Sequence, residues 1–278
     1  MQRPSALRPA FAASILILSA SAFAADGKIQ YSETRRVDHV DEYHGVKVPD
    51  PYRWLEDDVR ENKDVAAWVE AKNKEAFGYL ETIPEREPIR KRLNELWNYE
   101  KFGSPFKAGG RYYYFHNSGL QNQSVLFTQD SLGDEPRVFM DPNTWSKDGT
   151  VALSGTQFSD DGRFVAYGVQ EAGSDWRKWK IRDIASGKDL DDELNWVKFN
   201  SPDWTNDGQG FFYARYPEPS GDAEFQALNL NMKVYYHRVG TSQDLDVLVY
   251  ENPAEPSWGY QAEVTEDGRY LVITVWKG

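Results

Sequence analysis

Few residues in this 278-residue sequence are of types that do chemistry. It contains no Cys, which excludes a thiolate nucleophile, a disulfide framework and Cys-ligated zinc or iron–sulfur centres. Its four His, at positions 39, 44, 116 and 237, are scattered and leave little material for a His-based metal site. No G-x-S-x-G motif, the turn that exposes the nucleophilic Ser of an α/β-hydrolase, occurs in the sequence. We therefore assign no catalytic residue and expect no metal and no cofactor.

Two acidic clusters could be mistaken for reactive sites. Asp160 and Asp161 look like a catalytic carboxylate pair, but they precede Gly162, and we interpret them as turn residues because Asp-Gly pairs reverse the chain. Asp189–Glu193 (DLDDE) lacks the spaced ligands and central Gly of an EF-hand, so we predict a solvated loop. A glycosidase that uses paired carboxylates would rest on the acidic composition alone and is the least favoured function.

The overall composition limits the class of protein. Lys and Arg number 32 against 44 Asp and Glu, giving a net charge of -12, which argues against nucleic-acid or anionic-membrane partners. Hydrophobic residues make up 40% of the chain, so we expect it to fold.

The first 24 residues have the order of a secretory signal peptide. Arg3 and Arg8 precede the apolar run Phe11–Leu18, and the small-residue frame Ala22–Ala24 follows. The run is too short to span a bilayer, and a buried N-terminal helix is the alternative. We expect cleavage after Ala24, export to the periplasm or beyond the cell, and no membrane association afterwards, because no later segment approaches about 18 uninterrupted apolar residues.

Two amphipathic helices are predicted next. Apolar residues recur at helical spacing between Asp64 and Leu80, and again from Ile89 to Trp97, where Pro88 suits a first helical turn. Before them, His44–Asp58 has two Pro and no clean period, which indicates an extended arm. We assign residues 25–100 to this N-terminal arm and helices.

The remainder, residues 101–278, is predicted to be mainly β. Short runs rich in aromatic and branched residues occur at 111–115, 124–128, 163–167, 179–182, 210–213, 233–237 and 269–274. Turns ending at Gly110, Gly162, Gly208 and Gly268 introduce several of them, at intervals of 52, 46 and 60 residues. This repeat is typical of β-propeller blades of about four strands. Residues 265–278 supply a turn and one strand of a fourth repeat, so we expect an incomplete propeller of about three and a half blades and a longer parent protein.

Motifs in a fixed order give the sequence a family resemblance. They are Tyr43–Gly45 followed by Asp50–Glu56 (DPYRWLE), then Asn117–Gln123, Val125–Leu126, Val138–Pro142, Asp148–Leu153, Gly173–Trp176 and Val197–Phe199. From about residue 31 to 278 the chain resembles the N-terminal part of the prolyl oligopeptidases. These are serine peptidases in which a seven-bladed propeller caps an α/β-hydrolase domain.

The resemblance implies a function for the parent protein. It would be an exported, monomeric serine endopeptidase that hydrolyses short proline-containing peptides after Pro, with the propeller gating access. The Ser-Asp-His triad would lie in the C-terminal hydrolase domain, on which residues 25–100 would pack, so we expect this chain alone to be inactive. The alternative is a non-enzymatic exported propeller that binds a peptide or sugar.

Three residues are singled out by the resemblance. Phe199 matches a residue that lines the apolar part of the substrate site, and its alternative role is blade core. Gly259 stands where the family commonly has an apolar pocket residue, which changes the expected pocket shape. Asp175 matches a carboxylate that faces the hydrolase domain near a substrate-binding Arg. The alternative for Asp175 is a turn carboxylate or a surface ion pair.

Overall fold

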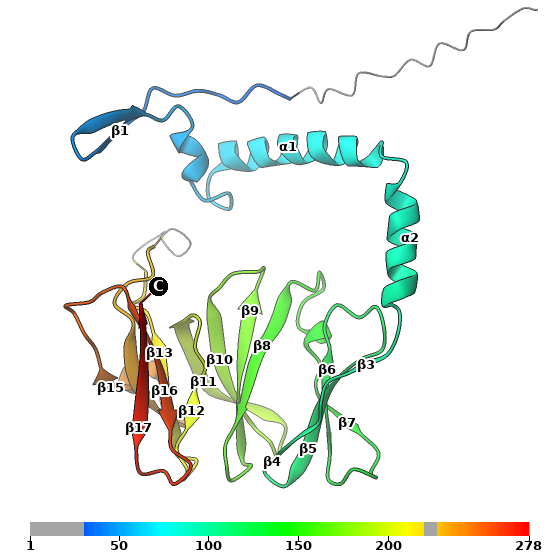
Figure 1. The fold of residues 1–278 in the computed structure, drawn as a ribbon, viewed down its shortest axis with the longest axis vertical. Coiled ribbons are helices and arrows are strands. Elements are labelled where there is room, and N and C mark those ends of the chain that lie inside the picture. Colours follow the sequence, from blue (N-terminus) through cyan, green and yellow to red (C-terminus); the bar gives the residue numbers. More distant parts are fainter. Residues whose placement is uncertain (1–30, 220–226, 278) are drawn as a thin grey trace, which may run out of the picture. The chain divides into compact units, whose positions relative to one another are not determined.

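A computed structural model describes residues 31–219 and 227–277, and the chain divides into two compact units at Arg86 and Glu87 (Figure 1). The predicted signal peptide, residues 1–24, lies outside the described residues. The unit boundary groups the second helix with the sheets, whereas the sequence placed the boundary after residue 100. None of the helices within the described ranges is long and apolar enough to cross a membrane.

The first unit contains a hairpin, a 3-10 turn and a helix. Strands β1 (Val40–Tyr43) and β2 (Val46–Pro49) pair antiparallel around His44 and Gly45, which both have positive φ, as a tight two-residue hairpin turn requires. The arm predicted as extended thus contains β2 and the 3-10 helix η1 (Arg53–Glu56). Arg53 organises this arm, because its guanidinium pairs with Asp41, with Asp50 at 3.1 Å and with Glu56 at 2.5 Å.

Helix α1 (Lys63–Glu81) confirms the helix predicted between Asp64 and Leu80. The Asn62 side chain caps it by accepting hydrogen bonds from the backbone N–H groups of Asp64 and Val65. The Trp68 indole N–H donates to the Thr34 hydroxyl at 2.9 Å, which attaches the preceding segment to the helix.

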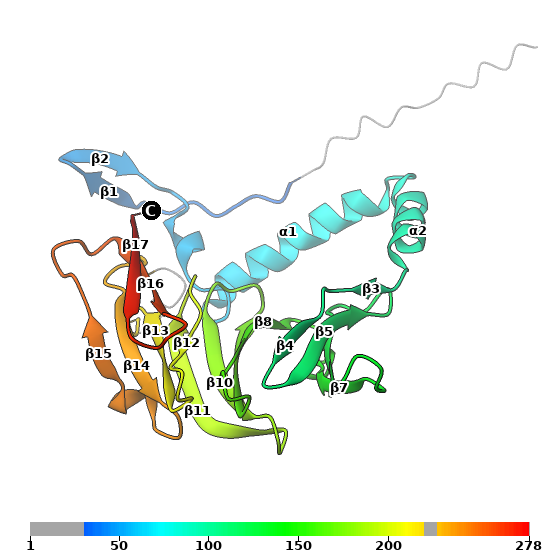
Figure 2. The same ribbon diagram turned by 60° about the horizontal axis from the view of Figure 1, so that its bottom comes forward.

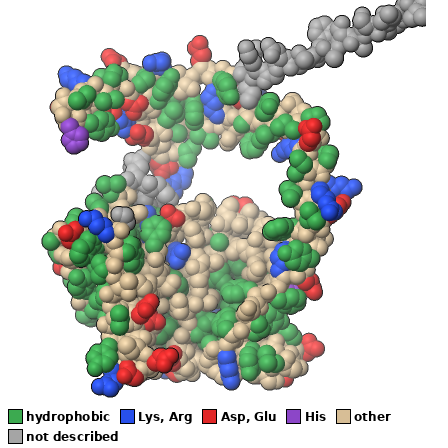
Figure 3. Space-filling view, viewed as in Figure 1, with side chains coloured by type: hydrophobic (Ala, Val, Ile, Leu, Met, Phe, Trp, Pro, Cys, Tyr) green, Lys and Arg blue, Asp and Glu red, His purple; other side chains and the backbone are tan. Residues whose placement is uncertain are grey.

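Helix α2 (Arg86–Trp97) opens the second unit, with Pro88 in its first turn as predicted. Its apolar residues lie at the surface, and hydrophobic side chains are visible along the helix (Figure 3). Ile89, Leu93, Leu96 and Trp97 are all at least half exposed. This amphipathic helix therefore has an apolar face that no described part of the second unit buries.

Four antiparallel sheets follow, each with its strands in nearly sequential order (Figures 1 and 2). The first contains β3 (Lys101–Phe102), β4 (Phe106–Ala108), β5 (Arg111–Asn117), β6 (Val125–Gln129) and β7 (Arg137–Met140), with β3 and β4 both pairing with β5. The second contains β8 (Val151–Phe158), β9 (Phe164–Glu171), β10 (Arg177–Asp183) and β11 (Lys188–Val197). The third contains β12 (Asp203–Trp204), β13 (Gly210–Arg215), β14 (Lys233–Arg238) and β15 (Val247–Tyr250). The fourth contains β16 (Trp258–Val264) and β17 (Leu271–Lys277).

This architecture confirms a partial propeller of about three and a half blades, and each of the seven predicted β runs falls on a strand. The short 3-10 helices η2 (Pro142–Thr144) and η4 (Gln243–Leu245) lie in connections. One detail differs from the prediction. Each Asp-Gly turn joins the first strand of a sheet to the second, rather than preceding the first strand. The fourth sheet therefore includes β16 before the turn as well as β17 after it, two strands instead of the one predicted.

Apolar clusters between successive sheets hold the propeller together. The first two sheets meet around Tyr113, Leu126 and Tyr167, the next pair around Trp179, Trp204 and Phe211, and the last pair around Met232, Val234 and Tyr260. Since each cluster draws on two neighbouring sheets, burial of these side chains stabilises the stack rather than any sheet alone.

The strands place their connections at two ends of the stack. We call one the turn end, made of residues 109–110, 159–163, 205–209 and 265–270, and the other the loop end, made of residues 118–124, 141–150, 172–176, 198–202 and 251–257. At the turn end, the Ser159 hydroxyl donates to Asp161 and the Gly162 N–H donates to the Ser159 carbonyl, and Thr205–Gly208 and Thr265–Gly268 repeat the pattern. The turn role predicted for these residues is confirmed.

Candidate functional site

All three residues that the sequence singled out lie at the loop end. Phe199 is on the loop between β11 and β12, Asp175 is on the turn between β9 and β10, and Gly259 is the second residue of β16. Arg177 pairs with Val197, which brings the Asp175 turn beside the Phe199 loop. The loop end of the second, third and fourth sheets is therefore the candidate site.

Phe199 does not belong to the blade core. Its side chain is 51% exposed, although the residues on both sides of it are buried, and its φ is +60°. Left-handed backbone is uncommon for a bulky residue that is not Gly, Asn or Asp, and such strain concentrates at functional sites. The exposed ring offers an apolar surface to a ligand.

The Phe199 loop is tied to the strand that carries Gly259. The Gln261 side-chain amide donates to the Ser201 carbonyl at 3.2 Å, and its oxygen accepts from the Ser201 N–H at 3.5 Å. Next along the chain, Asp203 accepts a hydrogen bond of 2.5 Å from the Val264 N–H. Burial raises the pKa of Asp203 above its usual value, an effect that this hydrogen bond opposes. The third and fourth sheets are thus joined by polar contacts at two levels, Gln261–Ser201 beside the candidate site and Asp203–Val264 next to the turn end.

Gly259 is buried beneath an aromatic side chain. It pairs with Trp276 across β16 and β17, and a Cβ atom built on Gly259 would lie 2.3–2.5 Å from three atoms of the Trp276 indole. The space that a side chain at position 259 would fill is therefore taken by Trp276. The sequence alone did not reveal that Trp276 lies beside Gly259, since the cross-strand partner of Gly259 depends on strand register.

Asp175 is exposed at the tip of an ordered turn. Ala172 and Gly173, which precede it, have φ values of +48° and +73°, and the Ser174 hydroxyl accepts a hydrogen bond from the Trp176 N–H at 3.1 Å. The Ser174 carbonyl also accepts a bond from the Gln170 amide. This turn directs the carboxylate outward, as expected for a residue that meets a partner or simply solvent.

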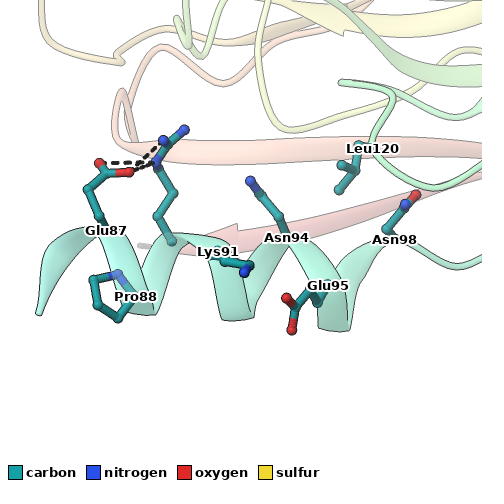
Figure 4. Close-up of a pocket in the computed structure, with 8 residues that line it drawn as sticks. Glu87, Pro88, Lys91, Asn94, Glu95, Asn98 and Leu120 are labelled. Carbon is teal, nitrogen blue, oxygen red and sulfur yellow. Dashed lines mark hydrogen bonds and ion pairs between the residues drawn. The ribbon is translucent and has the colours of Figure 1, made fainter.

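A groove with a volume of about 690 Å³ lies along α2 and reaches Leu120 of the loop end (Figure 4). It is lined by Glu87, Pro88, Arg90, Lys91, Asn94, Glu95, Asn98 and Leu120. The Arg90 guanidinium donates to the Glu87 carboxylate at 2.6 and 3.0 Å, so these two charges satisfy each other. Two of the eight lining residues, Pro88 and Leu120, are apolar, and the other six are polar or charged.

One prediction about the acidic cluster was wrong. Asp189–Glu193 is not a solvated loop but part of strand β11, and Asp192 is 4% exposed. Asp192 accepts hydrogen bonds from His237 Nε2 at 2.9 Å and from the Gly240 N–H at 2.6 Å. The alternation of exposed and buried positions along a strand explains how a run of acids can contain one buried carboxylate.

The buried His237 side chain bridges two carboxylates. Its Nδ1 lies 2.7 Å from Asp246, which also accepts a hydrogen bond from the Tyr213 hydroxyl at 2.5 Å. Burial lowers the pKa of His237, but the hydrogen bonds to Asp192 and Asp246 outweigh it and raise the pKa to about 9. With both ring nitrogens occupied, His237 has none left to activate a nucleophile. Within residues 31–219 and 227–277, no group of three or more potential ligands is arranged to hold a metal ion.

Comparisons with known proteins agree with this architecture. Residues 32–278 match the model of the family described as "Prolyl oligopeptidase, N-terminal beta-propeller domain". A prolyl endopeptidase of Elizabethkingia meningoseptica is 43% identical over 246 residues, covering 88% of this chain and 34% of that protein. Prolyl oligopeptidase A of Amanita bisporigera is 37% identical over 279 residues, covering 89% of this chain and 36% of that protein.

A solved structure gives the same result in three dimensions. Prolyl oligopeptidase B of Galerina marginata, bound to a 35-residue substrate for hydrolysis and macrocyclization, superimposes with a TM-score of 0.74 at 36% identity. The match covers 89% of this chain and 37% of that one. The present chain thus spans about a third of the length of the relatives that it matches.

Proposed function

This chain belongs to the prolyl oligopeptidase family, and on that basis we propose that it is the N-terminal portion of an exported serine endopeptidase that hydrolyses short peptides after proline. The observation that carries the proposal is the match of residues 32–278 to the family's N-terminal propeller, together with an exposed aromatic ring at the loop end. Export is proposed from the leader at residues 1–24.

The proposed role of the chain is to admit and hold the peptide rather than to cleave it. A Ser nucleophile, a His base and an orienting Asp would come from the C-terminal hydrolase domain of the parent protein. The propeller would exclude folded proteins and admit short peptides, which is a conformational step rather than a chemical one. The exposed apolar face of α2 is suited to packing on that domain.

Phe199 and Asp175 would serve this role in different ways. The Phe199 ring would bind Pro or a neighbouring apolar side chain by burial, which contributes about 25 cal/mol per Å² of apolar surface. Asp175 would face a substrate-binding Arg of the hydrolase domain. The indole of Trp276 over Gly259 would shape the wall beside them.

The division of labour can be tested directly. Purified residues 25–278 and the full-length protein would each be offered a proline-linked chromogenic peptide. We expect turnover from the full-length protein only, because the chain lacks a G-x-S-x-G turn. Turnover by residues 25–278 that a serine-directed inhibitor abolishes would contradict the proposal.

The contact made by Phe199 is tested by substitution in the full-length protein. Phe199→Ala is expected to weaken discrimination for Pro by about 1–3 kcal/mol, the usual range for apolar pocket contacts. Tyr270→Ala is the matched control, because this aromatic residue is 61% exposed but lies at the turn end. Unchanged kinetics in a stable Phe199→Ala protein would remove Phe199 from the substrate site.

A further inference from the structure

Phe199 is held between two buried polar residues. Lys198 is 8% exposed and Asn200 is 3% exposed, whereas Phe199 between them is 51% exposed. Long charged and amide side chains are seldom buried unless they have partners. The loop therefore anchors two side chains inward and directs one aromatic ring outward.

Asn200 fixes the loop to the third sheet. Its side-chain amide donates to the Lys198 carbonyl at 2.9 Å and to the Ala214 carbonyl at 2.8 Å, and its oxygen accepts from the Ala214 N–H at 3.1 Å. The hydrogen bond from Asn200 to Lys198 spans Phe199, because it joins the residue before Phe199 to the residue after it. This bond therefore closes the chain around Phe199.

Lys198 fixes the other side of the loop. Its Nζ lies 3.7 Å from the centre of the Trp176 ring and donates to the Asn229 side-chain oxygen at 3.0 Å. Trp176 in turn packs edge-on against Trp196 and Tyr216, with ring centres 5.5 and 6.3 Å apart. A cation over a Trp face is attracted more strongly where the cation is shielded from water, and Lys198 is buried.

We propose that Asn200 and Lys198 are positioning residues that hold Phe199 in its left-handed conformation and so present its ring, already ordered, to the peptide substrate. The inference rests on the proposed function, since it assigns these residues an effect on catalysis that passes through Phe199. A ring fixed before binding loses less conformational freedom when the peptide arrives, which strengthens the contact.

The test is a double-mutant cycle in the full-length protein, with kcat and KM measured for a proline-linked chromogenic peptide. Phe199→Ala and Asn200→Ala are each expected to lower kcat/KM by about 10- to 200-fold. The double variant is expected to be no worse than Phe199→Ala, because Asn200 acts only through the ring. A folded Asn200→Ala protein with unchanged kcat/KM, or losses that multiply in the double variant, would overturn the inference.

Lys198→Met provides a second variant, because it keeps an unbranched side chain only one atom shorter and removes the charge. It leaves the Asn200 hydrogen bonds in place and is expected to lower kcat/KM by roughly 2- to 30-fold, and not at all in the Phe199→Ala background. Should Asn200→Ala fail to fold, unchanged kinetics in Lys198→Met would still overturn the inference.

Asn206→Ala is the matched control. The Asn206 amide also donates a hydrogen bond to a carbonyl of a neighbouring sheet, that of Glu266 at 2.7 Å, but this contact lies at the turn end, so kcat/KM should not change.

The outcomes separate the two proposals. If Phe199→Ala has no effect, the substrate contact is wrong; if Phe199→Ala lowers kcat/KM while Asn200→Ala and Lys198→Met do not, the contact stands and the positioning role is wrong.

Discussion

At the turn end of the sheets, the same Ser/Thr-x-Asp-Gly turn recurs, with Gly at the position of positive φ, whereas at or next to the loop end two bulky residues, Trp196 and Phe199, adopt positive φ themselves. Within residues 87–219 and 227–277, the non-glycine residues with positive φ are Ala172, Trp196, Phe199 and Asn231, and all lie at or next to the loop end. Both ends reverse the same strands, so reversal alone does not require strain. The difference indicates that backbone strain at the loop end serves to direct particular side chains toward a ligand or partner.

Close packing also differs between the two ends. At the turn end, a Cβ atom on Gly109 would lie 2.3 Å from the Cα atom of Gly162, so turns of neighbouring sheets touch through their backbones. At the loop end, the close neighbour of Gly259 is the Trp276 ring. The backbone contact between Gly109 and Gly162 limits the spacing of the first two sheets, while the aromatic neighbour of Gly259 shapes a surface.

The largest expected effect concerns stability away from the loop end. Asp192→Ala would leave the buried His237 with one carboxylate, and breaking a buried ion pair costs about 3–5 kcal/mol. Thermal and urea unfolding would measure the loss. The neighbouring exposed Asp191→Ala is the control and should be close to neutral. If Asp192→Ala changed kcat/KM in the folded full-length protein, the assignment of stability to this region and function to the loop end would fail.

The same network predicts a pH dependence. The pKa of His237 is about 9 in the folded chain, against 6.5 for an unperturbed histidine, so folding favours the protonated ring. Its contribution, on the order of 3 kcal/mol, is complete below pH 6.5, declines as the pH rises, and is lost as the pH passes through 9. Unfolding free energies from pH 6 to pH 10 should show this decline. In the His237→Phe variant this decline of the unfolding free energy should disappear. If it persists, groups other than His237 cause it.

A smaller effect is expected where Gly259 packs against Trp276. Gly259→Ala would force its Cβ against the Trp276 indole and destabilise the protein by about 1–3 kcal/mol. In the Trp276→Ala background the same change should cost less, giving a coupling energy of about 1 kcal/mol or more in unfolding experiments. Gly133→Ala is the control, since nothing lies within 4 Å of its Cβ position. Strictly additive losses would show that Trp276 does not occupy the space beside Gly259.

Local patterns predicted much of the fold. Helical spacing located α1 and α2, aromatic and branched runs located seven strands, and Asp-Gly pairs located the turns, because each of these features depends on neighbouring residues. The buried role of Asp192 and the Trp276–Gly259 contact could not be predicted, since both depend on which strand lies beside which. Likewise, the exposure of Phe199 depends on the residues anchored around it, so the sequence left its core and substrate roles open.

The smallest expected effect separates two adjacent carboxylates at the turn end. Both residues are exposed, but Asp161 accepts hydrogen bonds from the Ser159 hydroxyl at 2.7 Å and from the Arg163 N–H at 3.0 Å, whereas the Asp160 side chain has no hydrogen-bond partner among the described residues. Asp161→Ala should therefore cost about 0.5–1.5 kcal/mol in unfolding experiments, and Asp160→Ala should be nearly neutral. Because a turn shapes the chain without touching substrate, both variants of the full-length protein should retain kcat/KM. A loss of turnover in either one would mean that the turn end also takes part in catalysis, and the contrast between the two ends would no longer hold.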